Sequence, residues 1–219
     1  MFELFQRLKG AVLALAALVA IATPAAATTF VPYGAQRDVE ISTVTDDWGW
    51  TQIYRGAGRS ILSYDTMFDG VGDYVMIGAV RTGETRIDML GAVAWEVFNT
   101  GTVLNATNAS NGLEWYNNHY SLGFAPLGAE ITQFRADTTE WSTDVDRMSW
   151  HTDGPGFGAV ATTINAGWRS AENYLYDGWD RIVFTADAPA PAPVPLPASG
   201  ALMVMALVAV GGLRRWARG

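Results

Sequence analysis

The chain has 219 residues, no cysteine and only 16% charged residues. This length predicts one domain, and the lack of cysteine excludes both a disulfide framework and a lipoprotein-type signal. Residues 28–187 hold nine arginines, 21 acidic residues and no lysine, a net charge of −12 (9 − 21). Such a domain repels phosphate backbones, so we expect no nucleic-acid partner.

The N-terminal segment has the three parts of a secretory signal. Basic residues precede an uncharged, mostly apolar run at residues 11–22, and Ala25 and Ala27 are the small residues that a signal peptidase reads. The apolar run is too short to cross about 30 Å of hydrocarbon comfortably, which favours a cleaved signal over a membrane anchor. We therefore expect residues 1–27 to be removed, so that the exported protein begins at Thr28.

Short segments rich in β-forming residues, separated by Gly, Asn and Asp turns, fill the region 28–187. The expected strands are 38–44, 59–64, 73–80, 84–90, 92–98 (alternatively a short helix), 113–116, 120–124, 130–134, 146–151, 157–164 and 179–185. The nearly continuous apolar run at 73–80 predicts a buried central strand, and 100–111 is expected to be a polar loop. Many short strands without an internal repeat predict an all-β fold, an antiparallel β-sandwich of jelly-roll type.

Patterns for catalysis and zinc binding are weak in this domain. His119 and His151 are the chain's two histidines, and neither cysteine nor a Gly-x-Ser-x-Gly elbow is present. Glu96, Glu114 and Glu140 each lie beside a tryptophan, and a glycosidase pairs carboxylates with aromatic platforms. Neighbours on a strand point to opposite faces, however, which explains such pairs as ordinary patterning. We therefore expect no enzyme, with a secreted glycoside hydrolase kept as an alternative.

Two groups of aspartates leave calcium binding open. The first group is Asp65, Asp69 and Asp73, and the second is Asp144, Asp146 and Asp153. Calcium takes several oxygen ligands from one loop, but neither spacing matches an EF-hand, and a solvated acidic loop is the alternative. We expect no cofactor, with calcium as the open case.

A candidate glycan-binding site lies next to the polar loop at 100–111. It consists of Trp115, Tyr116, Asn117 and Asn118. Aromatic faces stack on sugar rings, and side-chain amides bond sugar hydroxyls. The alternative is that the two rings pack in the core, because large aromatics fill sandwich interiors.

The C-terminal segment combines a stiff spacer, an apolar helix and a basic end. Alternating prolines in 188–197 favour an extended polyproline II rod. Residues 198–213 are uncharged and would form a transmembrane helix about 24 Å long, and residues 214–219 carry three arginines. By the positive-inside rule the arginines stay cytoplasmic, which places residues 28–187 outside the inner membrane. A plain membrane anchor would share these features.

The tail also carries a recognisable motif, the residues Val194, Pro195, Leu196, Pro197 and Ala198. Followed by an apolar helix and an arginine cluster, this motif resembles the PEP-CTERM sorting tails, specifically their VPLPA variant. The resemblance covers residues 194–218 and implies recognition by an exosortase, a membrane cysteine protease. It implies a precursor anchored in the inner membrane, then delivery to the cell surface or extracellular matrix of a Gram-negative bacterium that makes exopolysaccharide. The expected function is a structural or adhesive surface protein, with an exopolysaccharide-binding module as the alternative.

Overall fold

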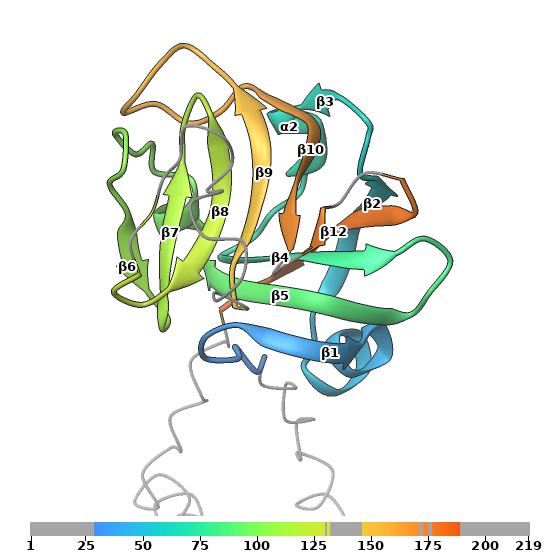
Figure 1. The fold of residues 1–219 in the computed structure, drawn as a ribbon. Coiled ribbons are helices and arrows are strands. Elements are labelled where there is room, and N and C mark those ends of the chain that lie inside the picture. Colours follow the sequence, from blue (N-terminus) through green and yellow to red (C-terminus); the bar gives the residue numbers. More distant parts are fainter. Residues whose placement is uncertain (1–28, 130, 132–145, 171–172, 175–176, 189–219) are drawn as a thin grey trace, which may run out of the picture. The chain divides into compact units, whose positions relative to one another are not determined.

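The computed structural model describes residues 29–129, 131, 146–170, 173–174 and 177–188, which are mostly β and form two antiparallel sheets (Figure 1). The predicted leader, the apolar C-terminal helix, the basic tail and nearly all of the proline-rich linker lie outside these residues. Within the described ranges, no helix is long and apolar enough to cross a membrane. The prediction of an all-β, antiparallel fold is confirmed.

The first sheet has five strands in the order β1-β5-β4-β12-β2. They are β1 (Gln36–Glu40), β5 (Arg86–Ala94), β4 (Tyr74–Arg81), β12 (Trp179–Ala186) and β2 (Thr51–Ala57). β4 and β5 form a hairpin, and β12 inserts between β4 and β2. β4 is therefore central, and all its residues from Val75 to Val80 are buried, as the apolar run predicted.

The second sheet has the order β11-β10-β9-β8-β7-β6, with β3 also paired to β10. Its strands are β3 (Leu62–Ser63), β6 (Asn108–Ser110), β7 (Leu113–Asn117), β8 (Ser121–Pro126), β9 (Met148–Asp153), β10 (Thr163–Ser170) and β11 (Asn173–Tyr174). Asn111 and Gly112 join β6 to β7 with positive φ angles of 49° and 79°, as a two-residue hairpin turn requires. Strands β6 to β11 are neighbours in chain order, a meander, whereas the predicted jelly-roll type implies a Greek-key order.

Several expected elements differ from those observed. The strand expected at 38–44 ends at Glu40, because Thr43–Asp47 forms a π-helical turn (η1) that buries Val44. Two short helices follow strand ends, α2 (Tyr64–Met67) and α3 (Trp95–Phe98), and the second matches the alternative expected at 92–98. The strand expected at 157–164 begins only at Thr163, and β2 and β6 lie where no strand was expected.

One hydrophobic cluster takes side chains from both sheets. Its larger members include Val75, Ile77, Val93 and Val183 from the first sheet and Trp115, Phe124, Met148 and Trp150 from the second. A second cluster covers the other face of the first sheet, where Val44 and Trp50 pack with Ile182 and Phe184. Burial of each such side chain stabilises the fold by about 1.5–3 kcal/mol, so these two clusters hold the sheets and the N-terminal segment together.

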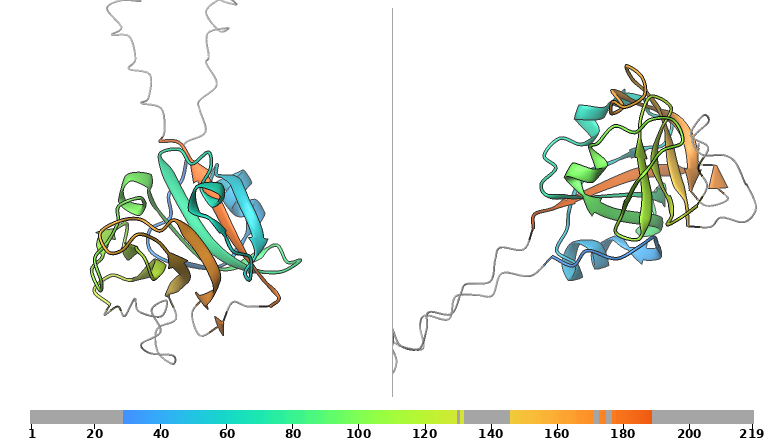
Figure 2. Two further views of the ribbon diagram at one scale, coloured as in Figure 1. Left: turned by 90° about the horizontal axis from the view of Figure 1, so that it is seen from above. Right: turned by 90° about the vertical axis from the view of Figure 1, so that its left-hand side faces the viewer.

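The two ends of the described domain meet. The Thr29 hydroxyl donates to the carbonyl oxygen of Asp187 at 3.3 Å, and the Ala188 N–H donates to Asp73 Oδ2 at 2.8 Å. The loop between β9 and β10 lies at the opposite end of this domain (Figures 1 and 2). The described chain therefore enters and leaves the domain at one edge.

Candidate functional site

The predicted glycan site is not on the surface. The exposed fractions of Trp115, Tyr116 and Asn117 are 1% each, and that of Asn118 is 0%. The Trp115 ring lies in the cluster between the sheets, and Tyr116 packs on the other face of the second sheet with Ala125. Neither ring can present a face to a sugar, so the predicted glycan site is wrong. Both rings pack in the interior, which was the alternative.

The two asparagines satisfy buried backbone and side-chain groups. Asn117 Nδ2 donates to Tyr64 Oη at 3.0 Å and to the Phe98 carbonyl oxygen at 3.1 Å, and its Oδ1 accepts the Ala161 N–H at 3.0 Å. Burial raises the pKa of Tyr64 well above its usual value, so its hydroxyl stays protonated. Asn118 Oδ1 accepts two backbone N–H groups in the β7–β8 turn. These amides therefore hold the fold together instead of facing a ligand.

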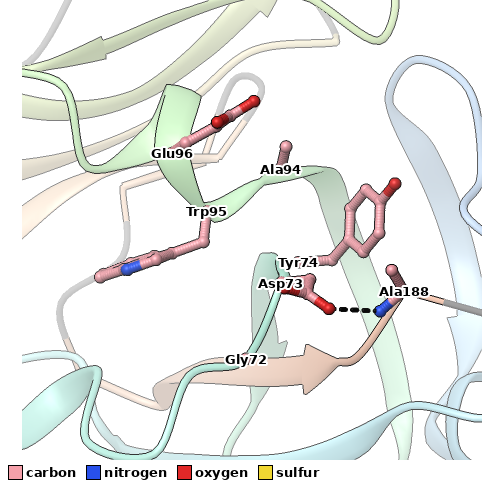
Figure 3. Close-up of a pocket in the computed structure, with 7 residues that line it drawn as sticks. All are labelled: Gly72, Asp73, Tyr74, Ala94, Trp95, Glu96 and Ala188. Carbon is pink, nitrogen blue, oxygen red and sulfur yellow. Dashed lines mark hydrogen bonds between the residues drawn. The ribbon is translucent and has the colours of Figure 1, made fainter.

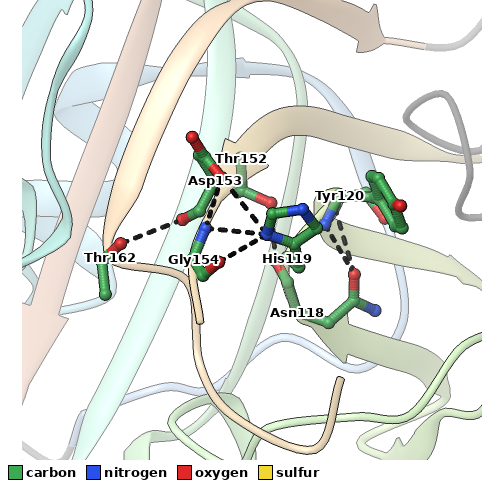
Figure 4. Close-up of polar contacts among 8 residues, drawn as sticks. Asn118, His119, Tyr120, Thr152, Asp153, Gly154 and Thr162 are labelled. Atoms are coloured by element: carbon green, nitrogen blue, oxygen red, sulfur yellow. Dashed lines mark hydrogen bonds and ion pairs between the residues drawn. The ribbon is translucent and has the colours of Figure 1, made fainter. Parts of the chain in front are cut away.

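His119 makes polar contacts with residues of the β9–β10 loop (Figure 4). Its Nδ1 lies 2.6 Å from the Gly154 carbonyl oxygen and 3.2 Å from Asp153 Oδ1. Its ring contacts that of Tyr120 edge-on at 4.6 Å between centroids, and Tyr120 in turn lies 5.3 Å from Phe157. These contacts tie the β7–β8 turn to the β9–β10 loop.

His151 lies on β9, directly opposite Ser121 of β8. Burial, and then the Arg181 cation, lower the pKa of His151, so the ring is neutral at pH 7. The buried Arg181 guanidinium donates to the Ser60 and Asn165 carbonyl oxygens and lies over the Trp150 ring at 5.6 Å. Its pKa is lowered to about 10 by burial, which leaves it charged at neutral pH.

The aspartates proposed for calcium do not form a metal centre in the part of the chain that is described. No group of three or more His, Cys, Asp or Glu side chains there could hold a metal ion. Asp73 uses one oxygen to bind the Ala188 N–H, and Asp153 lies against His119. Asp144 lies outside the described residues. Calcium binding therefore stays a prediction.

Trp95, where β5 ends and α3 begins, forms part of the wall of two hollows, and Figure 3 shows the first of them. The first measures about 330 Å³, and its walls include Asp73, Tyr74 and Glu96. The second measures about 410 Å³, and its walls include Asp65 and Asp69. Both volumes fall within the range of about 300–1,000 Å³ that is typical of small-ligand pockets.

The Trp95 ring is held in place by other aromatic rings. It is stacked with Phe98 at 5.7 Å and with Tyr64 at 6.3 Å between centroids, with interplanar angles of 27° and 26°. Its backbone N–H donates to the Asp73 carbonyl oxygen at 2.8 Å. The indole is only partly buried, so it combines a fixed position with an accessible surface.

Exposed carboxylates line the two hollows to which Trp95 belongs. The side chains of Asp65, Asp69 and Glu96 are exposed and make no ion pair or hydrogen bond with any described residue. By contrast, Asp180 pairs with Arg55 at 2.9 Å. Among the described residues, no Arg, Lys or His lines either hollow, so the carboxylates there make the local potential negative.

The adjacent Trp95 and Glu96 are the sequence signal for this site. Strand alternation accounts for Glu114 and Trp115 on β7 but not for this pair. The chain instead turns into α3 at Trp95, so both residues lie beside the same hollow (Figure 3). The alternative of a short helix at 92–98 was the available clue.

Comparison with known proteins yields no relative for this chain. No protein-family model matches it, and neither a curated protein nor a solved structure does.

Proposed function

We propose that this chain is an exported surface or extracellular-matrix protein of a Gram-negative bacterium. Its leader directs it across the inner membrane and is removed by a signal peptidase, and an exosortase recognises the motif at 194–198. The domain at 28–187, a β-sandwich in this proposal, has a structural or adhesive role and no catalytic one.

The observation that supports this proposal is the meeting of the domain's two ends. Thr29 contacts Asp187, and Ala188 is bonded to Asp73, so the chain enters and leaves at one edge. A domain built in this way can be carried on a tail at that edge while its other surfaces remain available for contact. The net charge of −12 (9 − 21) over residues 28–187 favours solubility outside the membrane.

Replacing residues 194–198 with Gly-Ser repeats tests the sorting step. The variant should remain in the inner membrane, while the unaltered protein reaches the cell surface only in cells that have an exosortase. The same replacement at residues 189–193, which are alternating Pro and Ala, is the matched control and should not change delivery. Surface delivery of the 194–198 variant in both strains would leave only the plain membrane anchor.

Two alternatives for the domain are separated by direct assays. Retention of the protein on the host's own exopolysaccharide would favour a carbohydrate-binding module over a purely structural role. Turnover of any substrate in a glycosidase panel would favour the hydrolase. Loss of that turnover in Glu96→Gln or Asp73→Asn would place the active site in the hollow that these residues line.

A further inference from the structure

Trp95 differs from the other tryptophans whose side chains are described. Trp50, Trp115, Trp150 and Trp179 are at most 5% exposed. Trp48 is partly exposed, but it packs against Phe30 at 5.4 Å and lines neither hollow. Within this group, only Trp95 combines partial exposure with a place in the walls of both hollows, and the near-parallel rings of Tyr64 and Phe98 hold it. Such a ring is suited to stacking against the apolar face of a flat ligand.

The charge around Trp95 restricts which ligand can stack there. The exposed carboxylates of Asp65 and Asp69, which pair with no described residue, border one hollow, and that of Glu96 borders the other. Carboxylates accept hydrogen bonds from hydroxyl and ammonium groups, and bonds to charged donors are the stronger kind. The same carboxylates repel phosphates and uronic acids. The complementary ligand is therefore a hydroxylated ring that also carries positive charge.

We propose that the two hollows beside Trp95 bind a glycan with free amino groups, of the kind represented by a β-linked glucosamine oligomer. One sugar ring stacks on the indole, and the ammonium groups of its neighbours bind the carboxylates of Glu96, Asp65 and Asp69. An oligomer suits the site because Trp95 belongs to the walls of both hollows, so that consecutive rings can occupy the two. This binding activity goes beyond the proposed structural role, and it does not depend on the sorting route.

Isothermal titration calorimetry at pH 6 on the full chain purified in detergent tests the proposal. Three hexamers serve as probes: glucosamine, N-acetylglucosamine and galacturonic acid. The glucosamine hexamer should bind saturably, and its affinity should fall as salt is raised because exposed charges are screened. The N-acetylated hexamer should bind at least about tenfold more weakly, since it lacks the charged donor, and the galacturonate hexamer should not bind.

Substitutions then assign the binding to this site. Glu96→Gln should weaken glucosamine binding about tenfold or more, because it removes the charge and keeps the shape. Glu84→Gln is the matched control, since Glu84 is also exposed but lies in the β4–β5 hairpin turn. Trp95→Ala should abolish binding, with Trp48→Ala as its control, and thermal melting of each variant separates lost binding from lost folding.

Several results would overturn the proposal. They are no saturable binding of the glucosamine hexamer, equal binding of its N-acetylated form, tighter binding of galacturonate, or equal effects of Glu96→Gln and Glu84→Gln. Because soluble probes are used, failed sorting in cells leaves this test unaffected, and failed glycan binding leaves the sorting proposal unaffected.

Discussion

Replacing Trp115 with alanine should strongly destabilise the domain. The ring is 1% exposed, and its centroid lies 5.1 Å from that of Phe124 and 5.8 Å from that of Phe98. Truncation of a buried tryptophan costs about 3–5 kcal/mol in the free energy of unfolding. Trp115 Nε1 also donates to the Ser110 carbonyl oxygen at 3.2 Å, and loss of that bond adds about 1 kcal/mol.

The expected loss is large compared with the total stability of such a domain, which is typically about 5–15 kcal/mol. In domains of this size, 1 kcal/mol shifts Tm by about 2–4 °C, so a loss of about 4 kcal/mol lowers Tm by roughly 8–16 °C. Thermal melting gives this shift directly. Urea denaturation should show a lower midpoint with an unchanged slope, because the surface exposed on unfolding changes little.

Trp48→Ala is the matched control for this experiment. Trp48 is partly exposed at the edge of the second cluster, so its truncation should cost clearly less than that of Trp115. The reasoning fails if Trp115→Ala costs less than about 1 kcal/mol, or if the two substitutions cost the same. Either result would mean that the Trp115 ring does not lie in the core.

Four further predictions concern the leader, the domain, a histidine and an asparagine. N-terminal sequencing of exported protein should begin at Thr28, and a chain that still starts at Met1 would contradict the leader. Residues 28–187 produced alone should give a far-UV circular dichroism spectrum dominated by β-structure; a helical spectrum would refute the assignment. Burial, and after it the Arg181 cation, holds the pKa of His151 below its usual value of about 6.5. As the pH falls through that value, the unfolded state binds more protons than the folded state, so the free energy of unfolding should decrease. His151→Gln should therefore flatten the dependence of the unfolding free energy on pH between about 5 and 7, and an unchanged slope would count against this account. Asn117→Ala should cost about 1–3 kcal/mol by urea denaturation, because it leaves buried groups without partners, and a neutral effect would show that water replaces the amide.

The local sequence pattern was sufficient to predict those structural properties that depend on neighbouring residues alone. The continuous apolar run at 73–80 predicted a buried central strand, because only a strand covered on both faces can be apolar at every position. β-branched and aromatic segments between turn residues likewise predicted antiparallel β-structure. The leader and the sorting tail are read in the same local way, and they stay predictions because they lie outside the described residues.

Tertiary structure alone decided which faces of the strands are covered. Alternation places Trp115 and Tyr116 on opposite faces of β7, but it does not say whether either face meets water. The first sheet covers Trp115, and Ala125 and Ile131 pack against Tyr116, so both rings are core. The asparagines that follow are buried for the same reason, and there they bind groups distant in the sequence, such as Tyr64.

The candidate site itself also depends on contacts between distant segments. The Trp95 ring packs against the Tyr64 ring of α2, and its hollow is bordered by Asp73 and Ala188, which are 115 positions apart in the chain. These segments meet because β12 pairs with β4, an arrangement set by the register of the whole sheet. Composition and local pattern determined the charge and the β-character of this protein. Which aromatic ring faces solvent was decided only by folding, because burial depends on what the rest of the chain places against each face.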